Sequence, residues 1–377
     1  MKDIRQPIPV SIVTGFLGAG KTTLLNRLLK DPALSETAVI INEFGDVPID
    51  HLLVERSGDG VIELSDGCLC CTVRGELVDT LADLVDRLQT GRLSALKHVV
   101  IETTGLADPA PILQSVMGHP VLCSYYRLDG VITLVDGVNG MATLDNHEEA
   151  VKQAAVADRL VLTKSDLAEE GPRASLLARL AALNPGAPVL DAARGEATVA
   201  RLFDCGLYDP ATKTADVARW LRDEAYRDAA HDHDHHADHH HHDVNRHDAR
   251  IRAFTLAHDR PIDPAALEMF IDLLRSAHGE RLLRMKGIVG LSDDPERPVA
   301  IHGVQTIFHP PARLPWWPDP EDRRTRLVLI TKDIGEDFVR SLFGAFTGQP
   351  GVDSPDRAAL TENPLAVPGH AMGRAGR

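Results

Sequence analysis

Positive charge, cysteine and long apolar runs are all scarce in this chain. Lys and Arg number 40 against 55 Asp and Glu, so the formal net charge is -15. A surface this acidic repels phosphate backbones, which argues against nucleic acid or an anionic membrane as a partner. No apolar run of about 20 residues occurs, and the N-terminus MKDIRQPIPV lacks a signal-peptide pattern. We therefore expect a soluble cytoplasmic protein without a membrane span.

The few cysteines are unevenly placed. Three of the five lie in the stretch DGCLCC, as Cys68, Cys70 and Cys71, whereas Cys123 and Cys205 are isolated and expected in the core. Cytosolic thiols stay reduced, and three so closely spaced do not suit disulfide geometry. Metal binding is favoured over redox chemistry, with buried cysteines packed as small apolar residues as an alternative. Thiolates suit Zn²⁺ or Cu(I), and three of them leave a tetrahedral site open for exchange.

The first half of the chain alternates short apolar runs with segments of helical periodicity. The runs are continuous and end in polar residues or glycine, as do strands of a parallel sheet covered on both faces. Strands are predicted at 9–15, 38–42, 98–104, 130–136 and 159–164, and helices at 21–30 and 75–89. This order predicts an open, mostly parallel α/β sheet.

The composition changes sharply at 231–247. Nine of the 18 histidines lie there, interleaved with aspartates, which predicts a mobile linker that could also capture divalent metal loosely. From Arg250 onward the pattern predicts a small α+β domain, with Asp263 as a helix N-cap. The predicted strands are RIRAFTLA, RLLRMKGIVGL, RPVAIHGVQTIFH and RTRLVLITK, and the predicted helices are 263–277 and GEDFVRSLFGAF.

The stretch GFLGAGKT, from Gly15 to Thr22, matches the phosphate-binding P-loop pattern. A predicted strand precedes it and a predicted helix follows it, which is the context that the motif requires. Its glycines let backbone N–H groups turn toward a phosphate, and the helix N-terminus adds positive potential. Lys21 would reach the β- and γ-phosphates, and the Thr22 hydroxyl would ligate Mg²⁺. The alternative is a glycine-rich turn that carries a lysine by chance.

A second phosphate-site signature is ETTG at the end of the third predicted strand. Glu102 stands where a carboxylate on the Mg²⁺ side belongs, and Gly105 where a backbone N–H would sense the γ-phosphate. The usual pattern has Asp, and the longer Glu102 would act more naturally through a metal-bound water. Acidic residues are common at the ends of strands, so this motif indicates a phosphate site only because a P-loop precedes it in the chain.

The stretch NEFGDVPIDH concentrates potential ligands after the second predicted strand. Glu43, Asp46, Asp50 and His51 are hard or borderline ligand types in one short segment. They could touch Mg²⁺, support the thiol site, or form a solvated loop, and the residues alone do not choose among these alternatives.

The stretch TKSD, from Thr163 to Asp166, points to the base of the nucleotide. An aspartate carboxylate accepts both the N1–H and the exocyclic amine of guanine, a pattern that adenine lacks. Lys164 can pack its stem against the base, and a mismatched base would leave the carboxylate unpaired. Most guanine-binding proteins carry Asn where this chain has Thr163. The alternative is a surface loop that contains Lys and Asp.

Together these motifs resemble the CobW family of P-loop GTPases, which includes the zinc-regulated GTPase metallochaperones. The shared order is P-loop, NEFG, GCLCC, ETTG, TKSD, a His-rich linker and a small C-terminal domain, from about Ile8 to about Phe346. The family carries Asn or Thr before Lys-x-Asp, so Thr163 falls within its range. The resemblance implies a P-loop GTPase domain (8–228), a His/Asp-rich linker (229–249), a CobW C-terminal domain (250–347) and a tail (348–377) that we expect to be disordered.

The resemblance also implies a set of site residues and ligands. Lys21 and Glu102 would act in catalysis, Thr22 and Glu102 would hold Mg²⁺, and Glu43 is a further candidate metal ligand. Cys68, Cys70 and Cys71 would bind zinc, or cobalt or another transition metal. The residues expected to bind GTP are Gly15, Phe16, Leu17, Gly18, Ala19, Gly20, Lys21, Thr22, Thr23, Gly105, Thr163, Lys164 and Asp166.

The resulting hypothesis is a GTP-hydrolysing metallochaperone that delivers its metal to a client metalloprotein. GTP with Mg²⁺ would order the loops that carry Glu43 and the three cysteines, and hydrolysis would loosen the metal site. The alternatives are a passive zinc store based on the His/Asp run, a regulatory GTPase with structural thiols, and an ATP-dependent kinase. No residue is evident that would orient the attacking water, so slow intrinsic hydrolysis is expected.

Overall fold

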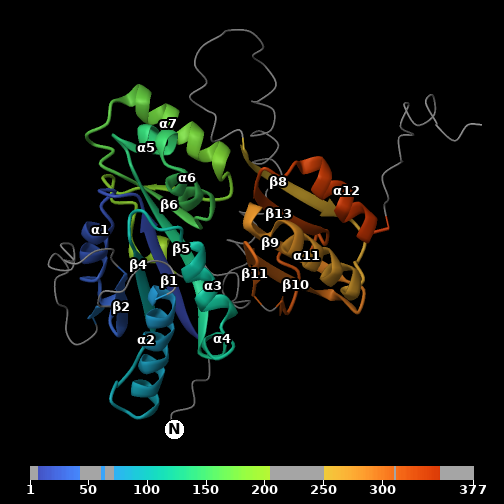
Figure 1. The fold of residues 1–377 in the computed structure, drawn as a ribbon, viewed down its shortest axis with the longest axis horizontal. Helices are drawn as coiled ribbons and strands as arrows, with labels where there is room; N and C mark the ends of the chain where they lie inside the picture. The colour runs from blue at the N-terminus through green and yellow to red at the C-terminus, as the bar shows by residue number, and fades with distance from the viewer. Residues whose placement is uncertain (1–6, 43–60, 64–71, 204–249, 310, 349–377) are drawn as a thin grey trace, which may run out of the picture.

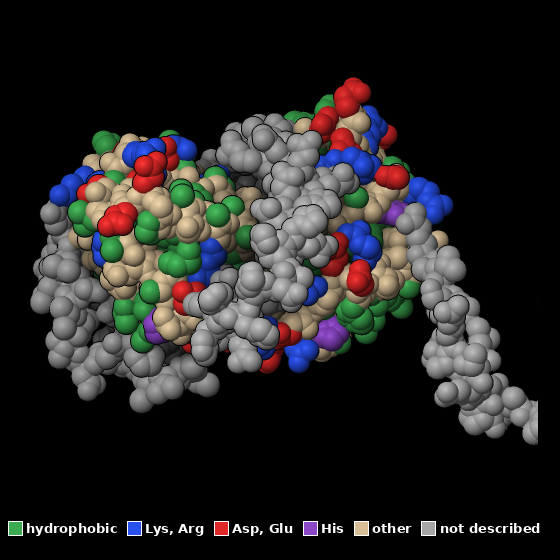
Figure 2. Space-filling view, turned by 90° about the horizontal axis from the view of Figure 1, so that it is seen from above, with side chains coloured by type: hydrophobic (Ala, Val, Ile, Leu, Met, Phe, Trp, Pro, Cys, Tyr) green, Lys and Arg blue, Asp and Glu red, His purple; other side chains and the backbone are tan. Residues whose placement is uncertain are grey.

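The computed structural model describes residues 7–42, 61–63, 72–203, 250–309 and 311–348. These residues form two sheets, one in each half of the chain, which lie side by side (Figure 1). Within the described ranges, no helix combines the length and the apolar character needed to cross a membrane. On the face drawn in Figure 2, the coloured basic and acidic side chains are interspersed and do not gather into one basic patch.

The first sheet has seven strands among the described residues, and all neighbours are parallel. Their order is β3 (Val61–Glu63), β2 (Thr37–Asn42), β4 (His98–Thr103), β1 (Ile8–Gly15), β5 (Tyr126–Asp136), β6 (Arg159–Thr163) and β7 (Val189–Asp191). The five strands expected from apolar runs are confirmed, although β5 begins four residues before the predicted position 130. The three-residue strands β3 and β7 were not predicted, because runs this short carry little periodic signal.

Helices cover both faces of this sheet, which explains why its strands are apolar throughout. Ile12 and Ile101 pack in one buried cluster with α2, and Val13 and Val100 in another with α1. The helices are α1 (Lys21–Leu28), α2 (Thr72–Gln89), α3 (Ala110–Gly118), α4 (Leu122–Tyr125), α5 (Gly140–Asn146), α6 (Glu148–Ala155), α7 (Glu170–Leu183) and α8 (Val199–Leu202), with a 3-10 turn η1 (Pro32–Leu34). Helix α2 begins three residues before the predicted start.

The second sheet is antiparallel and carries its helices on one face (Figure 1). Its strands are β8 (Ile251–His258), β9 (Leu282–Leu291), β10 (Asp294–Val304), β11 (Ile307–Phe308), β12 (Ala312–Arg313) and β13 (Thr325–Lys332), in the order β11-β10-β9-β13-β8, with β12 paired to β10. Helices α11 (Pro264–His278) and α12 (Glu336–Phe346) bury Phe270, Leu274 and Phe343 against it, and a 3-10 turn η4 (Gly279–Arg281) follows α11. The α+β prediction is confirmed.

In this half of the chain, one local prediction is confirmed and another is wrong. Asp263 is the N-cap of α11, and its carboxylate accepts from the backbone N–H groups of Ala265 and Ala266. The stretch predicted as one strand, RPVAIHGVQTIFH, instead folds back on itself as β10 and β11. Gln305 lies at the turn with φ 53, a left-handed conformation that ends a strand.

The two halves share an interface with an apolar part and an ionic part. Leu283, Val304 and Ile330 of the second sheet belong to the same buried cluster as the first sheet. Asp158, which directly precedes β6, accepts from Arg284 at 2.7 Å and also pairs with Lys286. The second sheet is therefore fixed to the first through buried contacts.

Candidate functional site

The P-loop follows β1 and lies at the carboxyl edge of the first sheet. Gly15 has φ 141, and a Cβ there would lie 2.5 Å from the carbonyl oxygen of Leu134, so only glycine fits. Gly18 and Gly20 have φ 73 and 89, the left-handed conformations that turn backbone N–H groups inward. Helix α1 then begins at Lys21, which directs its N-terminal N–H groups toward the same space. The local geometry is that of an anion-binding loop.

Lys21 is buried at this loop. Its ammonium donates to the carbonyl oxygen of Gly15 at 3.0 Å and lies 3.5 Å from that of Phe16. Both acceptors belong to the loop itself, so Lys21 is held at the loop by neutral carbonyls. A phosphate oxygen is a stronger partner for an ammonium group than a carbonyl, because the hydrogen bond is then assisted by charge.

Glu102 lies directly beside Thr22, although 80 residues separate them in the chain. The Thr22 hydroxyl donates to Glu102 Oε1 at 2.8 Å, and the two residues are 8% and 2% exposed. The parallel register of β1 and β4, with Val13 opposite Glu102, produces this contact. A hydroxyl and a carboxylate are the hard oxygen donors that Mg²⁺ takes in proteins, so the residues present fit that ion.

Gly105 packs against the P-loop backbone. A Cβ on Gly105 would lie 2.5 Å from the backbone nitrogen of Leu17, closer than any side chain allows. Two residues before Gly105, at the end of β4, the Thr103 hydroxyl donates to that of Thr14 at 2.7 Å and fastens the end of β4 to the end of β1. The loop after Glu102 is therefore in direct contact with the phosphate loop.

The TKSD stretch lies at the end of β6, next to the P-loop. The Thr163 hydroxyl donates to the carbonyl of Ala19 at 2.8 Å, across 144 residues, and so fastens the P-loop to this strand. Lys164 has φ 52 and donates to Asp136 at 2.7 Å, while Asp166 is exposed. The Thr163 hydroxyl therefore has a structural role, the bond to the P-loop, and a short polar side chain is sufficient for it.

No motif in the sequence marks three further residues of this site, Asp136, Gln153 and Asp191. Burial raises the pKa of Asp136, but hydrogen bonds from Lys164 and two backbone N–H groups hold that pKa below its usual value. Asp191 accepts from the Ser165 hydroxyl at 2.5 Å and places the end of β7 beside the TKSD stretch. Both aspartates end buried strands, a signal that could have found them. Gln153 lies within a helix and carries no such signal.

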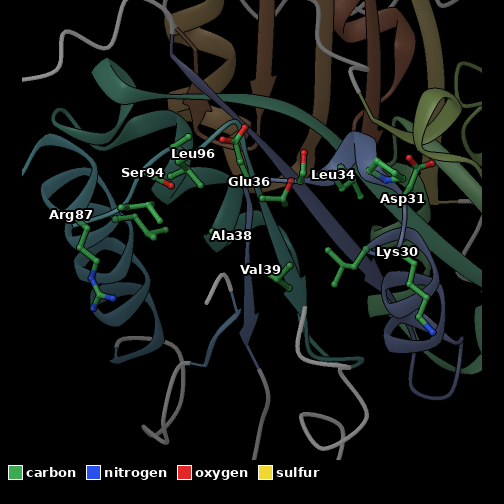
Figure 3. Close-up of a pocket in the computed structure, with 16 residues that line it drawn as sticks. Lys30, Asp31, Leu34, Glu36, Ala38, Val39, Arg87, Ser94 and Leu96 are labelled. Atoms are coloured by element: carbon green, nitrogen blue, oxygen red, sulfur yellow. The ribbon is translucent and has the colours of Figure 1, made fainter. Parts of the chain in front are cut away.

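A pocket of about 130 Å³ lies beside the P-loop and is lined by residues from four parts of the chain, among them Phe16, Ala19, Asp136, Asn139, Gln153 and Lys164. A larger pocket of about 450 Å³ lies at the amino end of β2, between η1 and the end of α2 (Figure 3). Its lining includes Lys30, Glu36 and Arg87. Open parallel sheets bind ligands at the carboxyl ends of their strands, so the larger pocket is not part of this candidate site.

The predicted transition-metal ligands lie outside the described residues. This applies to Cys68, Cys70, Cys71 and Glu43, as well as to the His/Asp run at 231–247. Among the residues that are described, no group of three or more His, Cys, Asp or Glu could hold a metal ion. Cys123 is a half-buried thiol in α4, so its expected place in the core is wrong, and Cys205 lies outside the described part.

Comparison with known proteins gives matches over both halves of the chain. Residues 9–191 match the family described as CobW/HypB/UreG, nucleotide-binding domain, and residues 251–347 match the cobalamin synthesis protein cobW C-terminal domain. The chain is 34% identical over 340 residues to the zinc chaperone YjiA of Escherichia coli, covering 89% of this chain and 98% of YjiA. It is 30% identical over 371 residues to the zinc chaperone CobW of Sinorhizobium sp, covering 90% and 97% of the two chains.

A solved structure extends the match to the fold. The crystal structure of Zn(II)-bound YjiA GTPase from Escherichia coli superposes with a TM-score of 0.64 at 30% identity. The superposition covers 90% of this chain and 99% of that one. Both sheets described above therefore have counterparts in a single known protein.

Proposed function

This chain belongs to the CobW family, and from that premise we propose that it is a GTP-binding and GTP-hydrolysing metallochaperone. It binds a transition metal, zinc in the first place and cobalt as a second candidate, at Cys68, Cys70 and Cys71. It passes this metal to a client metalloprotein when GTP is hydrolysed. Two relatives named as zinc chaperones, each similar over nearly its whole length, support this proposal.

The observation that carries the nucleotide half of the proposal is the contact between Thr22 and Glu102. Both oxygens lie at the mouth of a phosphate loop and are almost fully buried. Thr22 would bind Mg²⁺ directly and Glu102 would bind it directly or through a water. When bound there, Mg²⁺ would neutralise charge between the β- and γ-phosphates.

The chain's own residues then have defined tasks. Lys21 exchanges the carbonyl of Gly15 for phosphate oxygens, since its ammonium already lies at the loop. The N–H of Gly105 contacts the γ-phosphate, because Gly105 packs directly on the P-loop at Leu17. Asp166 accepts the N1–H and the amine of guanine, while Lys164 covers the base. Because a diphosphate lacks the γ-phosphate that Gly105 contacts, Gly105 distinguishes a triphosphate from a diphosphate.

The topology supports a link between the nucleotide and the thiols. Strand β3 ends at Glu63 and is parallel to β2, so the chain leaves the sheet at the edge that carries Glu102. Helix α2 begins at Thr72, the residue that follows Cys71. The segment between these two elements holds all three cysteines. The metal site and the triphosphate site are therefore proposed to share one edge of the sheet.

The decisive experiment measures zinc affinity in two nucleotide states. Zinc competition with a fluorescent chelator is run with a non-hydrolysable GTP analogue and with GDP. We expect tighter zinc binding with the analogue, and loss of that binding when Cys68, Cys70 and Cys71 are changed to Ala. Linkage requires zinc to tighten the analogue by the same factor. The matched control is Cys123→Ala, which removes a thiol outside the motif and should change nothing.

Two results would contradict the delivery proposal. Equal zinc affinity in both nucleotide states, with binding lost on deletion of 231–247, would identify a passive store. Hydrolysis that is independent of metal, with no zinc bound at the cysteines, would identify a regulatory GTPase.

Base selectivity has its own test at Asp166. Asp166→Asn replaces an acceptor pair with one acceptor and one donor, the pattern complementary to xanthine, which carries a carbonyl where guanine has its amine. We expect the variant to lose GTP binding and to gain XTP binding, with ATP bound by neither protein. Unchanged GTP binding would remove Asp166 from the base site.

A further inference from the structure

Gln153 is a buried glutamine on α6 whose side-chain amide faces the loop after Glu102. It is 1% exposed, and its Nε2 donates to the carbonyl of Gly105 at 3.2 Å and to that of Ala107 at 2.9 Å. These acceptors lie 48 and 46 residues away in the chain. One side chain therefore holds two carbonyls of the same loop, one on each side of Leu106.

The orientation of this amide is determined by its partners. Rotating it by half a turn would place Oε1 against two carbonyl oxygens, and none of the three could donate. In the orientation observed, Oε1 is buried and has no hydrogen-bond partner among the described residues. A buried acceptor without a partner is unfavourable. The two hydrogen bonds that Nε2 donates must offset this cost, and they are the reason that a glutamine suits this position.

Helix α6 gives Gln153 a fixed base. The Thr133 hydroxyl of β5 donates to the backbone carbonyl of Gln153 at 2.7 Å, which ties this part of the helix to the sheet. At the other end of α6, the ring of His147, its N-cap residue, stacks on Phe16 of the P-loop with centroids 4.3 Å apart. The helix thus contacts the phosphate loop while its glutamine contacts the neighbouring loop.

Gly105 is consequently held from two sides. Its Cα faces the backbone of Leu17 with no room for a Cβ, and its carbonyl is bonded to Gln153. We propose that Gln153 is a positioning residue that sets Gly105 for contact with the γ-phosphate and so determines the preference for triphosphate over diphosphate. This inference rests on the proposed function, in which the Gly105 N–H binds the γ-phosphate.

The test compares affinities for a non-hydrolysable GTP analogue and for GDP, measured by fluorescence of labelled nucleotides. Gln153→Leu keeps a similar volume but removes both donors. We expect analogue binding to weaken by about tenfold, the factor that corresponds to about 1.4 kcal/mol, and GDP binding to change by less than about twofold. Only the analogue reaches Gly105, which is why the two nucleotides should separate.

Asn184 offers a matched control. It is another buried amide, and its Nδ2 donates to the carbonyls of Ala154, Ala155 and Ala157 at the end of α6, away from the loop. Asn184→Leu should lower the melting temperature and leave the ratio of analogue to GDP affinity unchanged. An equal change of this ratio in Asn184→Leu and Gln153→Leu would assign the effect to α6 as a whole and overturn the role of the Gln153 amide.

Gln153→Glu provides a second variant with a pH readout. Its carboxylate would face two carbonyl oxygens at high pH, whereas the protonated acid regains one donor. Analogue affinity of this variant should therefore rise as the pH falls from about 8 to about 6, because burial raises a carboxyl pKa. A variant that binds the analogue as wild type does at every pH would overturn the inference. If wild type binds neither nucleotide, the proposed function fails; if it binds both and Gln153→Leu keeps its ratio, only this inference fails.

Discussion

Asp158 is the residue whose replacement should destabilise this protein most through the contact between its two halves. Its Oδ1 accepts from Arg284 at 2.7 Å and pairs with Lys286, and its Oδ2 accepts from the backbone N–H of Val131 at 2.9 Å. The Asp158 and Arg284 side chains are 4% and 5% exposed. Burial raises the pKa of Asp158, but the two cations outweigh burial and hold that pKa far below its usual value. The carboxylate is therefore charged and compensates the buried Arg284 and the partly exposed Lys286.

The substitution Asp158→Asn keeps the shape of the side chain and removes its charge. Arg284 is then left buried without this counter-ion and the partly exposed Lys286 loses its pair with Asp158. Breaking a buried ion pair by removing one partner costs about 3–5 kcal/mol in proteins. Because about 1 kcal/mol shifts the melting temperature of a 150–250-residue unit by about 2–4 °C, we expect a fall of about 6–20 °C. The magnitude follows from burial, since the same pair in water would contribute little.

Thermal unfolding followed by circular dichroism measures this effect. The matched control is Glu296→Gln, which breaks the pair between Glu296 and Arg323, whose side chains are 74% and 52% exposed. Exposed pairs contribute about 0–1 kcal/mol, so the control should lose no more than about 4 °C. A variant Asp158→Leu combined with Arg284→Met and Lys286→Met should be more stable than Asp158→Asn, because it leaves no buried charge. A fall of under about 3 °C in Asp158→Asn would refute this reasoning.

Two further predictions concern His302 and Gly105. Burial, with the charges of Arg284 and Lys286, keeps the pKa of His302 well below its usual value, so the folded ring is neutral. The unfolded chain takes up this proton below about pH 6.5, so stability should fall with decreasing pH, by up to about 1.4 kcal/mol per unit. Chemical denaturation between pH 7 and pH 5 gives the free energy of unfolding at each pH. This free energy should fall less steeply with decreasing pH in His302→Gln than in wild type, and an equally steep fall would contradict a neutral His302 in the folded protein. Gly105→Ala must push its loop away from Leu17. GTP hydrolysis should therefore fall at least about tenfold with GDP affinity retained, whereas wild-type turnover would exclude close contact between Gly105 and the nucleotide.

Much of the first sheet could be predicted because its strands are apolar on both faces. Continuous runs such as PVSIVTG have few alternatives to a buried strand when glycine follows, and the P-loop pattern sets the start of α1. The hairpin of β10 and β11 was missed because its turn residue, Gln305, is neither Gly nor Pro. The positions of Cys68, Cys70 and Cys71 fall outside the described residues, so the thiol site stays a prediction.

By itself, the sequence determined the order of the motifs and the chemical types of the groups they carry. Local patterns can be recognised within one short segment of the sequence, and this holds for the P-loop lysine, the strand-end glutamate and the clustered thiols. Only the tertiary structure decided which groups meet. The parallel register of β1 and β4 places Glu102 on Thr22, and packing of α6 places the amide of Gln153 on Gly105. Asp158 and Gln153 belong to no motif in the sequence, and their partners lie 126 and 48 residues away. No local sequence pattern predicts such contacts, because they form only when distant segments of the chain pack around a common core.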